Sequence, residues 1–145
     1  MSNMTFNIII PGKPMGKQRP KATLRGSHAG VYTPKNTINY ENLVVTMFHQ
    51  KYHDVEPIEG AIKGTIIAFY PIPSSASKKN KEKMLNHIIR PIVKPDLDNI
   101  EKIIYDALNG IAYKDDSRIV EQRCAKFYSE TPRVEVIITE VSKND

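Results

Sequence analysis

The sequence predicts an α/β (α+β) fold in which a mixed β-sheet packs against helices. Segments rich in β-branched and apolar residues alternate with segments whose apolar residues recur at helical spacing, in the order β-α-β-α-α-β-β. The 145 residues, 40% of them hydrophobic, are enough for one sizeable core. Because no internal repeat and no long linker divides the chain, we expect a single domain over residues 1–145.

The N-terminal third begins with a strand and ends with a helix. Residues 5–10 are β-branched and alternating, and Pro11-Gly12 stops them, which predicts a strand. Residues 12–21 are basic and interrupted by Gly and Pro, so we expect an extended loop, followed by a small hairpin over residues 22–33. Residues 36–52 carry apolar side chains at helical spacing and predict the first helix.

The same patterns predict the remaining elements. These are a strand over residues 61–69, helices over residues 75–89 and 98–108, and strands over residues 119–127 and 134–141. Asn109-Gly110 is a typical C-terminal stop for the third helix. Thr131-Pro132 lies between the last two strands, so we expect these strands to form a hairpin.

The composition excludes several classes of protein. The single cysteine, Cys124, rules out an internal disulfide framework and a cysteine-based zinc site, and it favours a reducing cytoplasm. No apolar run approaches the roughly 20 residues of a membrane span. Residues 1–10 are too short and uncharged to form a signal peptide. We therefore expect a soluble cytoplasmic protein without a membrane partner.

The charges are distributed unevenly along the chain. The formal net charge is +5, and residues 1–40 contain six Lys/Arg and no acidic residue. Residues 74–95 contain six Lys/Arg and one Glu, whereas residues 96–116 contain six carboxylates and two lysines. A site that holds cations beside a surface that holds phosphates would produce this pattern.

The first part of the acidic stretch also has a purely structural interpretation. Asp98-Asn99-Ile100-Glu101 has the form of a capping box, in which Asp98 begins the third helix and Glu101 reaches back to it. On this fragment alone, capping is the better explanation of Asp98. Asp96 would lie outside such a helix, so the cap does not explain it.

Carboxylates grouped with a lysine are the components of many metal nucleases. Lys102 lies four residues after Asp98, on the same helix face. Because the chain turns back after the helix, Asp115 and Asp116 could reach the neighbourhood of Asp96 and Asp98. Grouped carboxylates repel one another unless a cation compensates them, and Mg²⁺ prefers such ligands together with substrate phosphate. A nearby lysine could stabilise charge on the phosphate or protonate the leaving oxygen.

One long motif resembles the RusA family of Holliday junction resolvases. The motif is Lys94-Pro-Asp-Leu-Asp-Asn-Ile-Glu-Lys102-Ile-Ile-Tyr-Asp106-Ala-Leu-Asn-Gly110, continued by Tyr113-Lys-Asp115-Asp116-Ser-Arg-Ile-Val120. The N-terminal Gly12-Lys13-Pro14 and Lys17-Gln18-Arg19-Pro20-Lys21, followed by Tyr32-Thr33 and a helix, also look like this family. The resemblance therefore extends over nearly the whole chain.

The resemblance implies a function and a set of site residues. RusA proteins are small homodimeric endodeoxyribonucleases, often of phage or prophage origin. They use Mg²⁺, with Mn²⁺ as a substitute, and resolve four-way DNA junctions by paired symmetric nicks during recombination and repair. The family's metal-site aspartates fall on Asp96, Asp98 and Asp116, and its essential lysine falls on Lys102. Asp115 matches an acidic position that supports the third aspartate.

Several basic residues are candidates for contact with DNA. They are Lys13, Lys17, Arg19 and Lys21 on the extended loop, together with Lys94 before the acidic motif. No acidic residue lies near the loop in sequence, so we expect these side chains to contact phosphates. The lysines of residues 78–83 fit DNA contact and a solvated helix face about equally well.

Other residues have competing interpretations. Asn99 could support the metal site or the helix start, and we expect Asp106 to form an ordinary ion pair with Lys102. A two-fold dimer would match the symmetry of a four-way junction. Met84, Leu85 and Ile88 are candidates for its interface, although core packing explains them more simply.

Two other functions remain open from the residues alone. One is a metal-dependent, structure-specific nuclease that acts on flaps, RNA or other branched nucleic acids. The other is a junction-binding protein that does not cleave. The set of Asp96, Asp98, Lys102 and Asp116 argues against the second, because a protein that only binds has no need for carboxylates facing phosphate.

Overall fold

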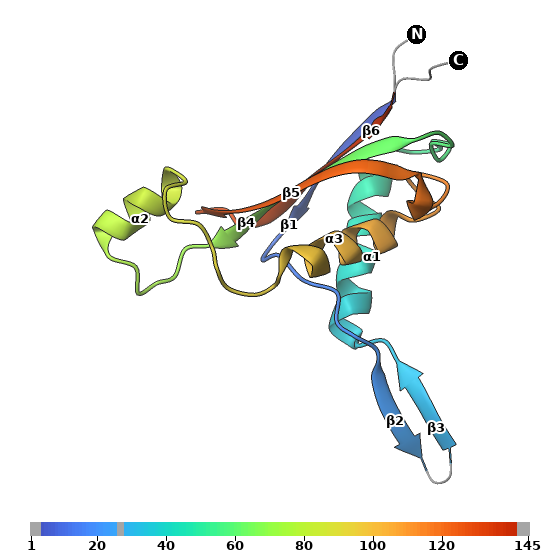
Figure 1. Ribbon diagram of the computed structural model, residues 1–145, viewed down its shortest axis with the longest axis horizontal. Coiled ribbons are helices and arrows are strands. Elements are labelled where there is room, and N and C mark those ends of the chain that lie inside the picture. Colours follow the sequence, from blue (N-terminus) through green and yellow to red (C-terminus); the bar gives the residue numbers. More distant parts are fainter. Residues whose placement is uncertain (1–3, 26–27, 142–145) are drawn as a thin grey trace.

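The computed structural model describes residues 4–25 and 28–141 and confirms the predicted α+β fold (Figure 1). In chain order, the elements are β1 (Thr5–Pro11), β2 (Lys21–Arg25), β3 (His28–Tyr32), α1 (Lys35–Lys51), β4 (Ile62–Pro71), α2 (Lys78–Leu85), α3 (Leu97–Leu108), the 3₁₀ helix η1 (Asp116–Arg118), β5 (Ile119–Ser129) and β6 (Arg133–Glu140). The predicted small hairpin is present as β2 and β3, and its tip at residues 26–27 lies outside the described residues. In the described part of the chain, no helix combines the length and the apolar character that a membrane crossing requires.

Four strands form one mixed sheet in the order β1-β6-β4-β5. β1 and β4 each pair antiparallel with β6, while β4 and β5 are parallel. The prediction that β5 and β6 form a hairpin is therefore wrong, because β4 lies between them. Burial explains this order: Val134, Val136 and Ile138 of β6 are at most 1% exposed, as a central strand requires, whereas β5 exposes most of its first half at the sheet edge.

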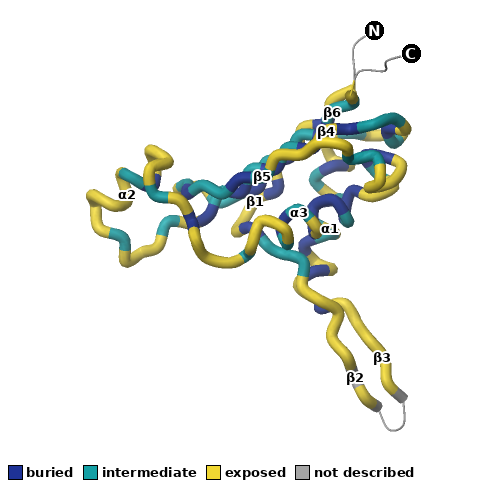
Figure 2. Tube along the Cα trace, viewed as in Figure 1, coloured by how far each residue is buried: buried dark blue, intermediate teal, exposed yellow. Residues whose placement is uncertain are grey.

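The helices α1 and α3 cover one face of the sheet and close the core (Figures 1 and 2). The core face of α3 is fully buried, with Ile100, Ile103 and Leu108 at 0% exposure. α3 also approaches β4 closely at Gly64, where any side chain would overlap the ring of Tyr105. Because α3 carries the acidic motif, this packing fixes the motif relative to the sheet.

Two parts of the chain stand away from the core (Figure 1). The β2–β3 ribbon projects from the N-terminal end of α1, and its described side chains are exposed (Figure 2). α2 stands at one end of the sheet and is shorter than the predicted helix over residues 75–89. The hydroxyl of Ser77 caps its start by accepting a 3.1 Å hydrogen bond from the Asn80 N–H, and His87, with φ 63°, turns the chain out of the helix.

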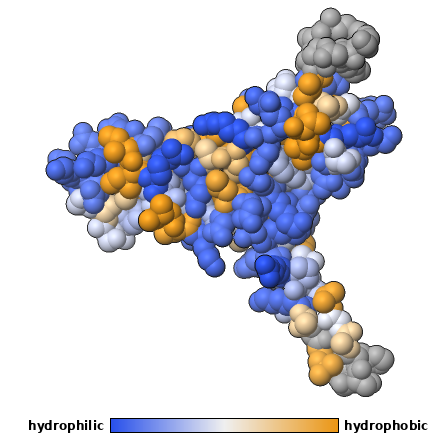
Figure 3. All heavy atoms as spheres, viewed as in Figure 1, coloured by the Kyte–Doolittle hydropathy of each residue, from blue (hydrophilic) through white to orange (hydrophobic). Residues whose placement is uncertain are grey.

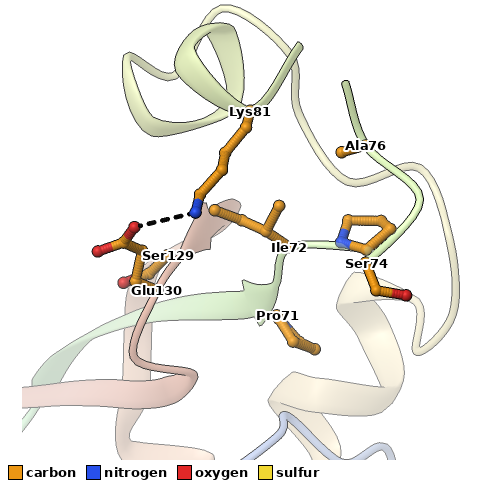
Figure 4. Close-up of a pocket in the computed structure, with 8 residues that line it drawn as sticks. Pro71, Ile72, Ser74, Ala76, Lys81, Ser129 and Glu130 are labelled. Atoms are coloured by element: carbon orange, nitrogen blue, oxygen red, sulfur yellow. Dashed lines mark ion pairs between the residues drawn. The ribbon is translucent and has the colours of Figure 1, made fainter. Parts of the chain in front are cut away.

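A pocket of about 490 Å³ lies between α2 and the ends of β4 and β5 (Figure 4). It is lined by Pro71, Ile72, Pro73, Ser74, Ala76, Lys81, Ser129 and Glu130. Its two charged side chains, Lys81 and Glu130, form an ion pair of 3.4 Å with each other. The residues around the pocket therefore hold α2 against the sheet. Because Lys81 is paired, it is less available to DNA than the other lysines of this helix.

Candidate functional site

The start of α3 differs from the predicted capping box. The helix begins at Leu97, so Asp96 is the N-cap residue and Asp98 lies in the first turn. The carboxylate of Asp96 accepts no capping hydrogen bond from the described residues, and both aspartates are exposed. The prediction that Asp98 caps the helix with Glu101 is therefore wrong. Both carboxylates remain available to a ligand, at the helix end where the dipole stabilises negative charge.

Two side chains from the sheet hold the turn that precedes Asp96. The Tyr70 hydroxyl donates a 2.5 Å hydrogen bond to the carbonyl oxygen of Pro95, and the Lys126 ammonium donates a 2.6 Å bond to the carbonyl oxygen of Val93. Burial raises the pKa of Tyr70, so its hydroxyl stays a donor at neutral pH. The turn is thus tied to the C-terminal end of β4 and to β5.

The basic loop docks onto this motif. The main-chain N–H of Lys17 donates a 2.9 Å hydrogen bond to the carbonyl oxygen of Asn99. Gly16 allows the approach, because a Cβ built there would lie 2.8 Å from the Cβ of Pro95 and 3.1 Å from the Cβ of Asn99. Two segments that are about 80 residues apart in sequence therefore meet at the start of α3.

A pocket of about 390 Å³ opens where the loop meets the motif. It is lined by Lys13, Pro14, Met15, Gly16, Lys17, Gln18, Lys94, Pro95, Asp96 and Asn99. Lys13 and Lys94 are exposed and line the same pocket as Asp96. The pocket therefore places groups that attract phosphate beside a group that attracts a cation.

Lys17 does not fit the prediction of a free phosphate-binding side chain. Its ammonium lies 2.8 Å from Glu41 and 3.3 Å from Asp106, and the side chain is 19% exposed. Burial alone would lower the pKa of Lys17, but the hydrogen bonds and charges of Glu41 and Asp106 outweigh it and raise the pKa. The sequence shows no acid near the loop, but α1 and α3 supply two in space. Lys17 therefore ties the loop to both helices.

Lys102 keeps an exposed ammonium on the same face of α3 as Asp98. Its side chain is 63% exposed, and its ammonium lies 3.8 Å from Asp106, which confirms the expected ion pair. This distance is longer than the 3.3 Å between Asp106 and Lys17. Asp106 is thus neutralised mainly by Lys17, and Lys102 remains free to approach a ligand.

Asp115 and Asp116 follow the turn after α3. The Asp115 carboxylate caps η1 by accepting a 3.0 Å hydrogen bond from the Ser117 N–H. Hydrogen bonds from Ser117, first through its hydroxyl and then through its main chain, lower the pKa of Asp115. Asp116 is the first residue of η1 and is exposed. The supporting carboxylate thus has a structural partner already, whereas Asp116 is exposed.

The structure does not bring Asp116 to the start of α3. η1 leads into β5, whose Ile119 pairs with Ile62 at the beginning of β4, whereas Tyr70 near the end of β4 holds the turn before Asp96 (Figure 1). Across residues 4–25 and 28–141, no three Asp, Glu, His or Cys side chains are close enough to share a metal ion. The expected return of Asp116 along α3 is therefore not observed.

The carboxylates at the start of α3 fit a hard divalent cation that is shared with a substrate. Mg²⁺ is usually bound by one or two carboxylates, with water and phosphate oxygens as the other ligands. Asp96 and Asp98 are two exposed carboxylates at one helix start, and Lys13 and Lys94 can hold a phosphate nearby. The residues do not fit an ion enclosed by three carboxylates of one chain.

The remaining basic candidates lead away from the pocket. Arg19 is exposed on the loop, and Lys21 is the first residue of the projecting strand β2. Together with Lys13 they form an exposed basic path along the segment that leads from the pocket to the β2–β3 ribbon. Basic side chains along such a segment can contact the phosphates of a nucleic-acid backbone.

Sequence patterns do not single out Glu41, Tyr70 and Lys126, although all three shape the site. Glu41 binds Lys17 from 24 residues away, and Tyr70 and Lys126 reach the turn before Asp96 from 25 and 33 residues away. Their surroundings in sequence carry no motif. The contacts exist only because the elements pack together, so local patterns contain no signal for them.

Comparison with known proteins identifies a family and a relative. A family model described as endodeoxyribonuclease RusA matches residues 11–139, a range that includes all the candidate site residues. The chain is also 38% identical over 139 residues to the uncharacterized protein YqaN of Bacillus subtilis (strain 168). That alignment covers 94% of this chain and 97% of YqaN.

Proposed function

Because the chain belongs to the RusA endodeoxyribonuclease family, we propose that it resolves four-way DNA junctions as a magnesium-dependent endonuclease. The proposed products are paired symmetric nicks, formed during recombination and repair. The RusA family acts on branched DNA junctions, and its nucleases generally depend on a divalent metal. The observation that carries the proposal is the pocket that Lys13, Lys94 and Asp96 line together.

Asp96 and Asp98 would hold the ion together with a phosphate oxygen of the DNA and water. When bound, a divalent cation polarises the phosphate and lowers the pKa of a bound water. Mn²⁺, which accepts the same oxygen ligands, would substitute for Mg²⁺. The family motif assigns Asp116 to the metal site and Asp115 to its support, and for these two residues the motif is the sole basis of the proposal.

Three lysines would act on the phosphate itself. Lys102 projects from the same helix face as Asp98, so its ammonium can stabilise charge that develops on the phosphate or protonate the leaving oxygen. Lys13 and Lys94 line the pocket and would fix the position of the strand. Correct placement of the reacting groups supplies much of the rate in such reactions.

The exposed path through Arg19 and Lys21 would carry an arm of the junction toward the β2–β3 ribbon. This ribbon projects from the core and could reach along an arm without disturbing the sheet (Figure 1). Contacts of this kind give affinity that depends on salt and not on base sequence.

We also propose that the protein acts as a homodimer. A four-way junction has approximate two-fold symmetry, and a C2 dimer would present two identical sites at a fixed separation. Two such sites account for paired nicks without any second activity. Light scattering of the protein in solution, alone and with a junction, tests this stoichiometry.

One assay separates the proposal from its alternatives. The protein is incubated with a labelled mobile four-way junction, a flap and a linear duplex, in Mg²⁺ or in EDTA. Paired symmetric nicks in the junction alone, dependent on Mg²⁺, would support the proposal. Preferential cutting of the flap would favour a different structure-specific nuclease. Tight junction binding without cutting would favour a junction-binding protein.

A further inference from the structure

The chain between α2 and α3 presents apolar side chains to water. Ile88 is 68% exposed, Ile92 is 95% exposed and Val93 is 56% exposed. Figure 3 shows hydrophobic surface over α2 and over the chain that follows it, surrounded by hydrophilic surface. Exposed apolar groups that gather in one place typically mark a surface that meets another molecule. We call Ile92 and Val93 the apolar tip.

The apolar tip is held in place by contacts on both sides. The guanidinium of Arg90 donates a 2.6 Å hydrogen bond to the carbonyl oxygen of Lys126 and lies 3.8 Å from the ring centre of Phe127. The Lys126 ammonium in turn donates to the carbonyl oxygen of Val93, and Pro91 is buried. The main chain is thus anchored to β5 while the side chains of Ile92 and Val93 point away. Their exposure is built into the fold and does not come from a loose loop.

The apolar tip lies directly beside the proposed cleavage site. Asp96 is three residues after Val93, so at most about 11 Å of chain separates the two. Lys126 holds the carbonyl oxygen of Val93, and Tyr70 holds that of Pro95, so one pair of strands positions both features. Whatever meets Ile92 and Val93 is therefore close to the phosphate that the site would cut.

The charges around the apolar tip favour DNA over a second copy of the chain. Residues 74–95 carry six Lys/Arg and one Glu, and Lys126 adds a further positive charge. In a two-fold contact this patch would face itself, which would bring like charges together. Two exposed side chains also provide far less area than the roughly 800 Å² that each partner buries in a stable interface. DNA is a polyanion whose bases have apolar faces, so it matches both the positive charge around the apolar tip and the apolar side chains of the tip itself.

We propose that Ile92 and Val93 insert between bases at the branch point of the junction, next to the phosphate that is cut. The inference rests on the proposed function and adds the element that recognises the branch. Apolar side chains inserted between bases are a known way to unstack and kink DNA. At a branch point stacking is already interrupted, so insertion costs less there than in a continuous duplex. The insertion would select branched DNA and bring its backbone to Asp96.

The test uses a fluorescent base whose emission rises when it is unstacked. 2-Aminopurine is placed at the branch point of a four-way junction or, in a second substrate, inside one arm. The protein carries Asp98→Asn so that it binds without cutting. The test variant adds Ile92→Ser with Val93→Ser, and the conservative variant adds Ile92→Leu with Val93→Ile. The matched control adds Ile9→Ser, which replaces a side chain that is 50% exposed on β1 and does not line the pocket.

We expect emission to rise at the branch point and not inside the arm. The Ser variant should lose this rise, and without the Asp98 change it should cut the junction about tenfold more slowly or worse, because the backbone is no longer brought to the site. The conservative variant and Ile9→Ser should behave like the parent. Circular dichroism and thermal melting verify that each variant is folded.

Each contrary outcome has a distinct meaning. If the parent binds and the active protein cuts, but emission at the branch point does not change, insertion is wrong and the proposed function stands. If the Ser variant converts a dimer into a monomer, the apolar tip belongs to a subunit interface and the inference is overturned. If the active protein neither binds nor cuts the junction, the proposed function itself has failed, and the inference falls with it.

Discussion

The main-chain N–H of Lys17 donates a 2.9 Å hydrogen bond to the carbonyl oxygen of Asn99. The side chain of the same lysine reaches Glu41 on α1 and Asp106 on α3. One residue of the basic loop therefore connects three parts of the molecule. Lys13, four residues earlier, remains exposed at the pocket. Substitution of Lys17 and substitution of Lys13 should consequently have different effects on stability and on junction binding.

Lys17→Met should destabilise the protein, and Lys13→Met should not. Among the described residues, loss of Lys17 leaves the half-buried Glu41 carboxylate without a charged donor and leaves Asp106 with only the more distant Lys102, so we expect the free energy of unfolding to fall by about 1–3 kcal/mol. Lys13→Met should change it by less than about 0.5 kcal/mol but weaken junction binding. Urea unfolding and a binding titration of both variants measure the two effects. Equal stability of the two variants would contradict the ion-pair role of Lys17.

The contribution of Lys17 to the free energy of unfolding should depend on pH only in alkaline solution. Burial lowers its pKa, but Glu41 and Asp106 more than compensate, so the pKa in the folded protein lies above the ordinary 10.5. A lysine whose pKa is higher in the folded than in the unfolded protein stabilises the fold. This stabilisation is complete below the pKa of the unfolded state and is lost as the pH rises through the pKa of the folded state. The stability difference between the native protein and Lys17→Met should therefore be constant near neutral pH and shrink above pH 10.5. A difference that shrinks already near pH 8 would refute this assignment.

Gly16→Ala should impair cleavage while leaving the fold intact. The new Cβ would lie 2.8 Å from the Cβ of Pro95, so the loop must move away from the turn that carries Asp96. A shift of about 1 Å in such a site can cost up to about a hundredfold in rate. Gly60→Ala is the matched control, because its Cβ would lie 3.9 Å from the end of the Glu140 side chain. Junction cleavage and circular dichroism compare the two, and equal cleavage rates would show that the loop does not position the site.

Asp98→Asn should abolish cleavage and preserve junction binding, since it removes one proposed metal ligand and keeps the shape of the side chain. Mn²⁺ binding to the free protein, followed by electron paramagnetic resonance, should weaken in Asp96→Asn and Asp98→Asn. Because Asp116 is not grouped with them, Asp116→Asn should lose cleavage and leave this Mn²⁺ binding unchanged. Continued cutting by Asp98→Asn would overturn the metal assignment. Weaker Mn²⁺ binding by Asp116→Asn would show that the carboxylates come together in solution.

Removal of a phosphate-binding lysine should reduce the salt dependence of junction binding. For Lys13→Ala and Lys94→Ala we expect the slope of log affinity against log salt to fall by about 1 each. Lys63→Ala is a suitable control, because Lys63 pairs with Glu121 at 3.2 Å on the sheet. Slopes that match the control for both variants would exclude these lysines from the DNA path.

Local patterns in the sequence predict most elements but not their pairing. The helix expected over residues 98–108 is observed as Leu97–Leu108, because its apolar face is continuous and its C-terminal stop is strong. The order of β5 and β6 could not be predicted, since alternation shows which face of a strand is buried and not which strand lies beside it. The helix over residues 75–89 is predicted too long because apolar residues at helical spacing, up to Ile88 and Ile89, continue past the point where His87 turns the chain out.

For the candidate site, too, local patterns predict the residues but not the contacts between distant segments. Asp96, Asp98 and Lys102 were found from spacing and from the family motif, and the structure exposes all three at the start of α3 and on its face. The partners of Lys17 were not found, because Glu41 and Asp106 approach it only after α1 and α3 have packed. The position of Asp116 likewise depends on how the elements pack. The length of chain after α3 allowed a return along the helix, but the parallel pairing of β4 and β5 directs it to the other end of β4.

The central position of β6 has a consequence for synthesis of the protein. β6 follows β1, β4 and β5 in the chain and so leaves the ribosome after them, yet it is the strand that joins β1 to β4. A nascent chain that already contains the whole acidic motif can still lack the strand that unites the two halves of its sheet. The face against which α3 packs is therefore completed only after β6 has been synthesised. A ribosome-bound fragment that ends before Arg133 should thus carry the cleavage motif without the rigid support that aligns it, which delays nuclease activity until β6 has joined the sheet.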